Sequence, residues 1–131
     1  MLFRSNPAFP DALVVPKEIA LLPIDTGNYR YKIVSGASIT GAVWANVTSD
    51  STVQYNSNTT ATMSGGNVLT SGYITSTVQA GGAINLADSI FKYQLERNSL
   101  TSTMTTFTLA VTCGTATANT VGSISFEEVV Y

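Results

Sequence analysis

The fold of this chain is decided by residues 29–34, Tyr-Arg-Tyr-Lys-Ile-Val. Aromatic and apolar side chains alternate there with Arg30 and Lys32, and a period of two residues is typical of a β-strand with one buried face. The same alternation recurs in residues 53–56, 91–96 and 107–113. Its recurrence predicts that strands make up most of the chain.

Turn-forming residues separate about eight such segments, which recur at roughly ten-residue spacing. The predicted strands span residues 29–34, 39–47, 53–56, 59–63, 68–78, 91–96, 103–112 and 121–130. Residues 68–78 are consistent with one long strand or with two short ones broken near Gly72. Small and polar residues at 114–119 predict a hairpin loop between the last two strands, and the one predicted helical turn is at 86–90. We therefore expect an all-β fold, a two-sheet antiparallel sandwich that is jelly-roll-like.

The first 17 residues differ from the rest. Prolines at 7, 10 and 16 remove backbone donors, which opposes regular strand pairing. The stretch is nevertheless too apolar for a free tail, because it contains Phe3, Phe9, Leu13, Val14 and Val15. We predict an extended N-terminal arm at residues 1–17 and one β-domain at residues 18–131. The arm contacts either a neighbouring subunit or its own domain, and both alternatives stay open.

Composition argues against several classes of partner. Charged residues are 11% of the chain, the net charge is −2, and 14 serines and 19 threonines supply a neutral polar surface. No basic run is present, so nucleic acid is not an expected partner. No apolar run approaches the length of a bilayer span and no signal peptide is recognisable, so we expect synthesis in the cytosol and no membrane partner. The single cysteine, Cys113, continues an alternating run and is predicted to be a buried small hydrophobe.

Catalytic signatures are missing from the sequence. The chain has no histidine, which excludes Ser-His-Asp and Cys-His sites and the usual zinc ligation. Glu127 and Glu128 are adjacent on a predicted strand, so they point to opposite faces and cannot act as an acid–base pair. Asp50 and the asparagines 46, 56 and 58 offer oxygens that suit calcium, but such residues are also ordinary turn formers. We expect no enzyme activity, no cofactor and no metal.

Three aromatic residues are candidate glycan contacts: Trp44, Tyr55 and Tyr73. Sugar sites commonly offer aromatic faces, whereas core packing is the commoner role of a lone tryptophan in a β-sandwich. Arg30 and Lys32 form either ion pairs with Glu96 or Glu127 or a solvated face. The glycine pairs at 65–66 and 81–82 are predicted turns, since neither opens a helix as a phosphate cradle would.

The order of several phrases carries a resemblance to a known family. The phrases stand at residues 51–56, 64–74, 91–99 (with Leu-Glu-Arg-Asn at 95–98), 107–111 and 122–128. In this order the chain, from about residue 18 to 131, resembles the C-terminal β-domain of virion structural proteins of tailed bacteriophages, particularly those of cyanobacteria and other aquatic bacteria. The N-terminal residues have no counterpart in that resemblance.

The resemblance implies a particle component located in the virion and made in the host cytoplasm. Its partners would be further copies of itself, as a homotrimer, and the phage major capsid protein or other virion proteins. The preferred expectation is a capsid decoration or cement protein that stabilises the shell through subunit contacts. The alternative is a head- or tail-fibre module that binds host surface glycan. The resemblance supplies no catalytic residues.

Overall fold

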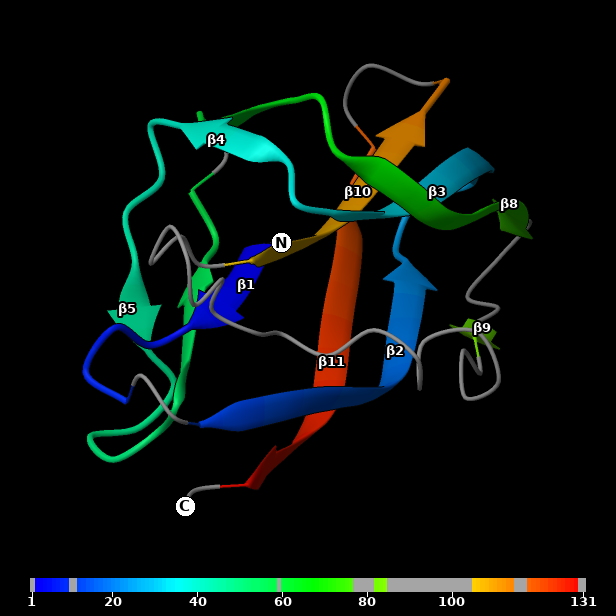
Figure 1. Cartoon of the computed structure of the whole chain (residues 1–131). Helices are drawn as coiled ribbons and strands as arrows, with labels where there is room; N and C mark the ends of the chain where they lie inside the picture. Colours follow the sequence, from blue (N-terminus) through cyan, green and yellow to red (C-terminus); the bar gives the residue numbers. More distant parts are fainter. Residues whose placement is uncertain are drawn as a thin grey trace.

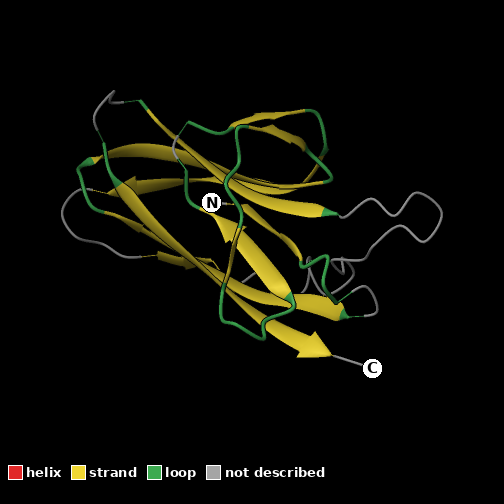
Figure 2. Cartoon of the chain, turned by 90° about the vertical axis from the view of Figure 1, so that its left-hand side faces the viewer, coloured by secondary structure: helices red, strands yellow, loops and turns green. Residues whose placement is uncertain are grey.

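The computed structural model describes residues 2–9, 12–58, 60–76, 82–84, 105–114 and 118–129. Within this part the chain is all-β, with antiparallel strand pairing and no helix (Figures 1 and 2). The strands are β1 (Leu2–Ser5), β2 (Leu13–Pro23), β3 (Gly27–Ser35), β4 (Ser38–Thr40), β5 (Ala45–Asn46), β6 (Val53–Asn56), β7 (Thr62–Ser64), β8 (Asn67–Ser76), β9 (Gly82–Ile84), β10 (Thr106–Cys113) and β11 (Thr120–Val129). The expected all-β class with antiparallel sheets is confirmed.

The largest sheet has six strands in the order β5-β6-β1-β10-β3-β8. β1 lies inside it, with Phe3 opposite Tyr55 of β6 on one side and opposite Phe107 of β10 on the other. β3 has the alternation predicted from its sequence, because Tyr29 and Ile33 are buried while Arg30 is exposed. The N-terminal strand thus joins segments that lie more than fifty residues apart in the sequence.

A second sheet has three strands in the order β11-β2-β9. β2 and β11 pair from Leu13 opposite Val129 to Pro23 opposite Thr120. The register shifts between Ser125, which is opposite Glu18, and Phe126, which is opposite Pro16, so Lys17 is the extra residue of a bulge in β2. β4 and β7 form a separate two-stranded sheet.

One hydrophobic cluster joins the six-stranded and three-stranded sheets. Its members alternate inward from β1, β2, β3, β6 and β10 and are Phe3, Val14, Ile19, Leu21, Ile33, Val53, Phe107 and Leu109. Burying such side chains contributes roughly 1.5–3 kcal/mol each to folding before the entropy cost is subtracted. The cluster therefore fixes the two sheets against each other.

The strand pairings do not separate an arm of residues 1–17 from a domain of residues 18–131. Residue 17 falls inside β2, and both Phe3 and Val14 belong to the core. Pro7 and Pro16 are compatible with strand pairing, and their positions explain why; Pro10 lies outside the described residues. Pro7 is in the turn after β1, and Pro16 is beside the bulge, where β9 no longer pairs with β2 in the described part of the chain.

The predicted hairpin between the last two strands is wrong. β10 pairs with β1 and β3, whereas β11 pairs with β2 in the other sheet. The segment between β10 and β11 therefore connects two different sheets. Its composition predicts a turn but does not indicate which strands pair on either side of that turn. The predicted strand at 91–96 and the predicted helical turn at 86–90 lie outside the described residues.

Two glycine positions explain how the middle of the chain divides. The predicted strand at 39–47 is split into β4 and β5, because Gly41 takes a φ of 78° and leaves the strand conformation. β8, in contrast, is one continuous strand through Gly72. Tyr31 packs over Gly72, since a Cβ there would lie 2.6 Å from the Tyr31 hydroxyl oxygen.

Candidate functional site

A polar surface lies where β1, β5 and β6 meet. Arg4 and Gln54 are opposite each other in register and point away from the core, because Phe3 and Val53 occupy the inward positions. Arg4 Nε donates to Gln54 Oε1 at 2.9 Å, and Gln54 Nε2 donates to Asn46 Oδ1 at 2.9 Å. The alternation of the strands thus assembles a row of amides and one guanidinium.

Trp44 lies against this row. The Arg4 guanidinium carbon is 4.4 Å from the centroid of the Trp44 ring, which is a cation–π distance. Partial burial of Arg4 lowers its pKa. Trp44 is half-buried and lies outside the hydrophobic cluster, and the Arg4 guanidinium covers one face of its ring.

The structure does not bring the three aromatic glycan candidates together. Tyr55 points to the opposite face of the sheet from Trp44 and packs against the core cluster. Tyr73 is on β8, four strand positions from β6, or roughly 19 Å at the usual strand spacing. A single sugar ring cannot contact all three.

A buried hydrogen-bond node joins the two sheets at the loop before β6. Ser51 Oγ donates to Glu128 Oε1 at 2.6 Å, and the Thr52 backbone N–H donates to Glu128 Oε2 at 3.1 Å. From the other side Asn6 Nδ2 donates to Ser51 O at 3.0 Å, and the Asn6 N–H donates to Thr52 O at 2.7 Å. The end of β11 is thereby tied to the turn after β1. We call Asn6, Ser51, Thr52 and Glu128 the loop node.

The two neighbouring carboxylates point to opposite faces, as their adjacency on a strand predicted. Burial opposes ionisation of Glu128, but the hydrogen bonds from Ser51 and Thr52 outweigh it and the pKa of Glu128 is lowered. Glu127 is exposed and pairs with Lys17 Nζ at 2.7 Å, which lowers the pKa of Glu127. Glu128 is therefore a structural anion rather than a proton donor at neutral pH.

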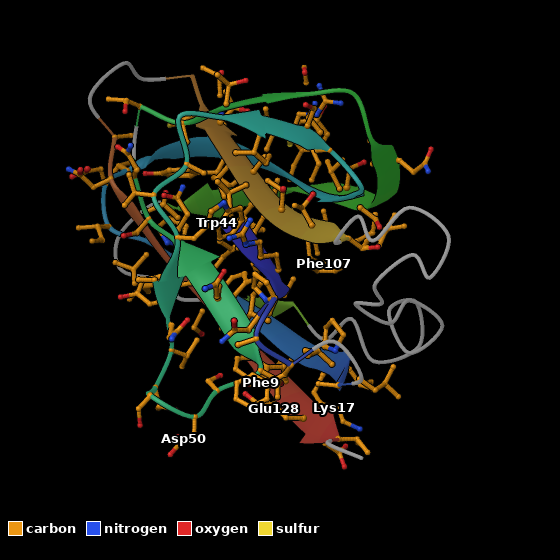
Figure 3. All side chains as sticks on the ribbon, turned by 60° about the vertical axis from the view of Figure 1, so that its left-hand side comes forward. Phe9, Lys17, Trp44, Asp50, Phe107 and Glu128 are labelled. Atoms are coloured by element: carbon orange, nitrogen blue, oxygen red, sulfur yellow. The ribbon has the colours of Figure 1, made fainter. Side chains whose placement is uncertain are left out.

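The candidate calcium ligands have other partners. Asn46 Oδ1 accepts from Gln54, Asn56 Oδ1 accepts from the N–H of Val43 at 2.9 Å, and Asn58 Oδ1 accepts from the N–H of Thr60 at 3.1 Å. Asp50 is exposed on an outer loop (Figure 3). Across the described ranges no three His, Cys, Asp or Glu side chains are grouped as a metal site would require. Asn56 and Asn58 each accept from the amide two residues on, as turn formers do, whereas Asn46 lies in β5 and bonds to Gln54 of β6.

A cavity of about 620 Å³ lies where β1 begins beside β10. Asn56 and Thr108 flank Leu2 in its wall, and two of their buried atoms, Asn56 Nδ2 and Thr108 Oγ1, have no hydrogen-bond partner. The cavity also reaches Cys113, which is half-buried. No sequence signal pointed to this cavity, because its wall comes from distant strands whose order the sequence does not reveal.

The candidate arm contacts divide into two groups. Phe3 and Val14 are buried in the core, while Phe9, Leu13 and Val15 are half-buried. A different apolar surface is exposed at the end of β2, where Leu22 is opposite Val121 and Ile24 follows. Leu22 is 45% exposed, and Val121 and Ile24 are each 53% exposed. We call these three residues the apolar end patch; sequence reasoning missed it because Leu21-Leu22 does not show which of the two leucines faces inward.

The part of the chain that the structure describes contains no helix long and apolar enough to cross a membrane. Comparison with protein-family models, curated proteins and solved structures finds no match to this chain.

Proposed function

We propose that this protein is a virion structural component, and specifically a capsid decoration protein that stabilises a bacteriophage shell through protein contacts. The observation that carries the proposal is the outer face of the three-stranded sheet. Along β2 and β11 this face consists of apolar and hydroxyl side chains apart from Glu18 and the Lys17–Glu127 pair. Away from these three side chains the described part of the face carries no charge, which suits permanent protein contacts because their centres are depleted of charge.

The finer architecture belongs to the same proposal. We infer a jelly-roll-like sandwich in which the six-stranded and three-stranded sheets are the two layers. The single hydrophobic cluster with members from both sheets supports it. The resemblance to phage virion proteins agrees with this architecture and adds the expectation of a homotrimer.

The apolar end patch is the contact that we assign to the shell. The exposed apolar area of this patch belongs to Leu22, Ile24 and Val121. A partner that covered this area would remove it from water, which contributes roughly 25 cal/mol per Å² to the binding free energy before the costs of association are subtracted. Phe3 and Val14 cannot make that contact, because they are already buried in the core of their own chain.

Introducing charge into the apolar end patch is expected to detach the protein from particles without unfolding it. In the double variant Leu22→Asp/Val121→Asp, two opposed carboxylates would have to be desolvated on docking, so occupancy on purified particles should fall at least tenfold. Quantitative mass spectrometry of particles gives the occupancy. Val43→Asp is the matched control, because Val43 is 70% exposed on a different surface.

Unchanged occupancy of the double variant would remove the patch from the proposal. Particles that lack the protein altogether are expected to lose DNA at lower temperature than complete particles. Equal heat resistance of the two preparations would remove the stabilising role itself.

A glycan-binding fibre module is the second candidate, and the Arg4–Trp44 stack favours it. The stack stands beside the amides of Gln54 and Asn46, which are groups that hydrogen-bond sugar hydroxyls. Because Trp44 is the only tryptophan, its fluorescence reports this surface alone. Emission that stays constant during titration with host-surface polysaccharide would count against this candidate, whereas a saturable change that Arg4→Met abolishes would favour it over decoration.

A further inference from the structure

Among the described residues, β8 is an edge strand whose own sequence lacks the usual protection. It ends the six-stranded sheet, and within the described residues only β3 pairs with it (Figure 1). Its ten residues, Asn67–Ser76, include no charged residue and no proline. Charged side chains and prolines are the devices that normally stop an edge from pairing with another chain. β8 therefore lacks the sequence features that prevent an edge strand from pairing with another chain.

The direction of the β3 backbone groups follows from two hydrogen bonds at the ends of the β3–β10 pair. In an antiparallel ladder the N–H and C=O of one residue point to the same neighbour, and successive residues alternate. The Gly36 N–H donates to Thr106 O at 2.9 Å, and the Gly114 N–H donates to Asn28 O at 3.3 Å. Even-numbered residues of β3 thus bond toward β10, and odd-numbered residues bond toward β8.

The outward groups of β8 follow from this alternation. The backbone groups of Tyr31 point toward β8, and Tyr31 is opposite Gly72. The N–H and C=O groups of residues 70, 72, 74 and 76 therefore point toward β3. Ser71, Tyr73 and Thr75 consequently present their N–H and C=O groups to the outside. The only register shift in this pair, between Ile33 and Val34, lies at the other end of β8 and leaves residues 70–76 regular.

The other long edge strand in the described part of the chain is different. β11 carries Glu127 and Glu128, and charged side chains oppose edge-to-edge pairing. The remaining sheet ends are β4, β5, β7 and β9, and each has only two or three residues. Among the described strands, β8 alone combines length, regularity and neutrality.

We propose that β8 pairs antiparallel with β8 of a second copy of this chain, about a two-fold axis at Tyr73. The outward residues then oppose one another in three pairs, Tyr73 with Tyr73 and Ser71 with Thr75 twice, each exchanging two main-chain hydrogen bonds. The two six-stranded sheets become one continuous sheet. This contact uses neither the apolar end patch nor the Arg4–Trp44 stack, so its test does not depend on binding to a shell. Its two-fold symmetry differs from the homotrimer that the resemblance implies, and the oligomeric state in solution distinguishes the two.

Side chains at the axis fit a second copy. Tyr73 is 78% exposed, and two such rings opposed across a strand pair form a favourable aromatic contact. Among the described residues, the cations of the neighbouring strand β3 are Arg30, opposite Tyr73, and Lys32, opposite Ser71. Two copies of Arg30 would be separated by three strand spacings, about 14 Å, which exceeds the Debye length of about 8 Å at physiological salt. Charge repulsion therefore does not oppose the pairing.

The test is the oligomeric state of the full chain and of two matched variants, measured by light scattering and sedimentation from about 10 μM to 1 mM, the range of weak association. Both variants change the exposed residues Ser71 and Thr75, which are about 13 Å apart along one strand and face each other only in the dimer. Ser71→Glu/Thr75→Glu places like charges opposite each other. Ser71→Glu/Thr75→Lys places opposite charges there.

We expect a monomer–dimer equilibrium for the unmodified chain, at least a tenfold weaker dimer for the Glu/Glu variant, and a dimer for the Glu/Lys variant that is at least tenfold tighter than that of Glu/Glu. Amide exchange at residues 71, 73 and 75 should slow as concentration rises. A monomer or a trimer throughout the range would overturn the proposal, as would equal association of the two variants with circular dichroism spectra that match the unmodified chain.

Discussion

Replacing Gly66 with alanine is expected to lower the free energy of unfolding by about 3 kcal/mol or more, as the sum of backbone strain and overpacking. Gly66 has a φ of 83°, which alanine adopts only under strain. A Cβ at this position would also lie 2.7 Å from Val34 Cγ1, 2.9 Å from Ala37 N and 2.9 Å from Ser35 O. Two of these atoms belong to the backbone and cannot move aside cheaply. Urea denaturation followed by circular dichroism measures the loss.

Gly65→Ala is the matched control. Gly65 has a similar φ of 66°, but a Cβ there meets nothing within 4 Å. The control should therefore lose only the conformational part, about 1 kcal/mol. If both variants lost the same stability, the close approach of Gly66 to β3 would not be the cause.

Replacing Glu128 with alanine is expected to lower the free energy of unfolding by about 2 kcal/mol, because the variant loses charge-assisted hydrogen bonds and leaves buried donors unsatisfied. The donors are Ser51 Oγ and the Thr52 N–H, both in residues that are at most 4% exposed. Glu127→Ala is the control, since it removes an adjacent carboxylate that is exposed and bound to Lys17. It should leave stability nearly unchanged.

The Glu128 effect should depend on pH. The folded state holds the pKa of Glu128 below its unfolded value of about 4.3, so the stabilisation is fully present above that value. It is lost as the pH falls through the folded pKa. Denaturation curves of the unmodified chain and of Glu128→Ala should converge on acidification from about pH 6 toward pH 3, and a constant difference over this range would contradict the assignment.

The residues that form strands could largely be predicted from the sequence, but the pairing of those strands in sheets could not. In residues 29–33 the alternation reflects burial on one face, because Tyr29 and Ile33 are buried while Arg30 is exposed. Residues 53–56 form the predicted strand, but Val53 and Asn56 are both buried, so this strand is covered on both faces. Which strand lies beside which depends on side chains that meet only in the folded chain. Residues 120–129 show a clear strand period, for example, but nothing in them specifies pairing with β2 rather than with β10.

The same distinction applies to the candidate site. Tyr55 and Trp44 are both aromatic residues near β6, yet the phase of each strand sends one to the core and the other to the surface. The loop node was not predictable, because Glu128 contacts Ser51 across 77 positions of the sequence. The opposite orientation of Glu127 and Glu128 was predictable, since it depends only on their adjacency.

The position of β1 between β6 and β10 governs when this protein can fold during synthesis. Leu2–Ser5 leaves the ribosome before its partners at residues 53–56 and 106–108, which are made much later. The six-stranded sheet therefore cannot be completed until β10 has emerged, and its nucleation requires contacts of high sequence separation, which fold slowly. A stalled nascent chain ending before residue 106 would expose the unpaired edges of β1 and β3, and it would need protection from aggregation.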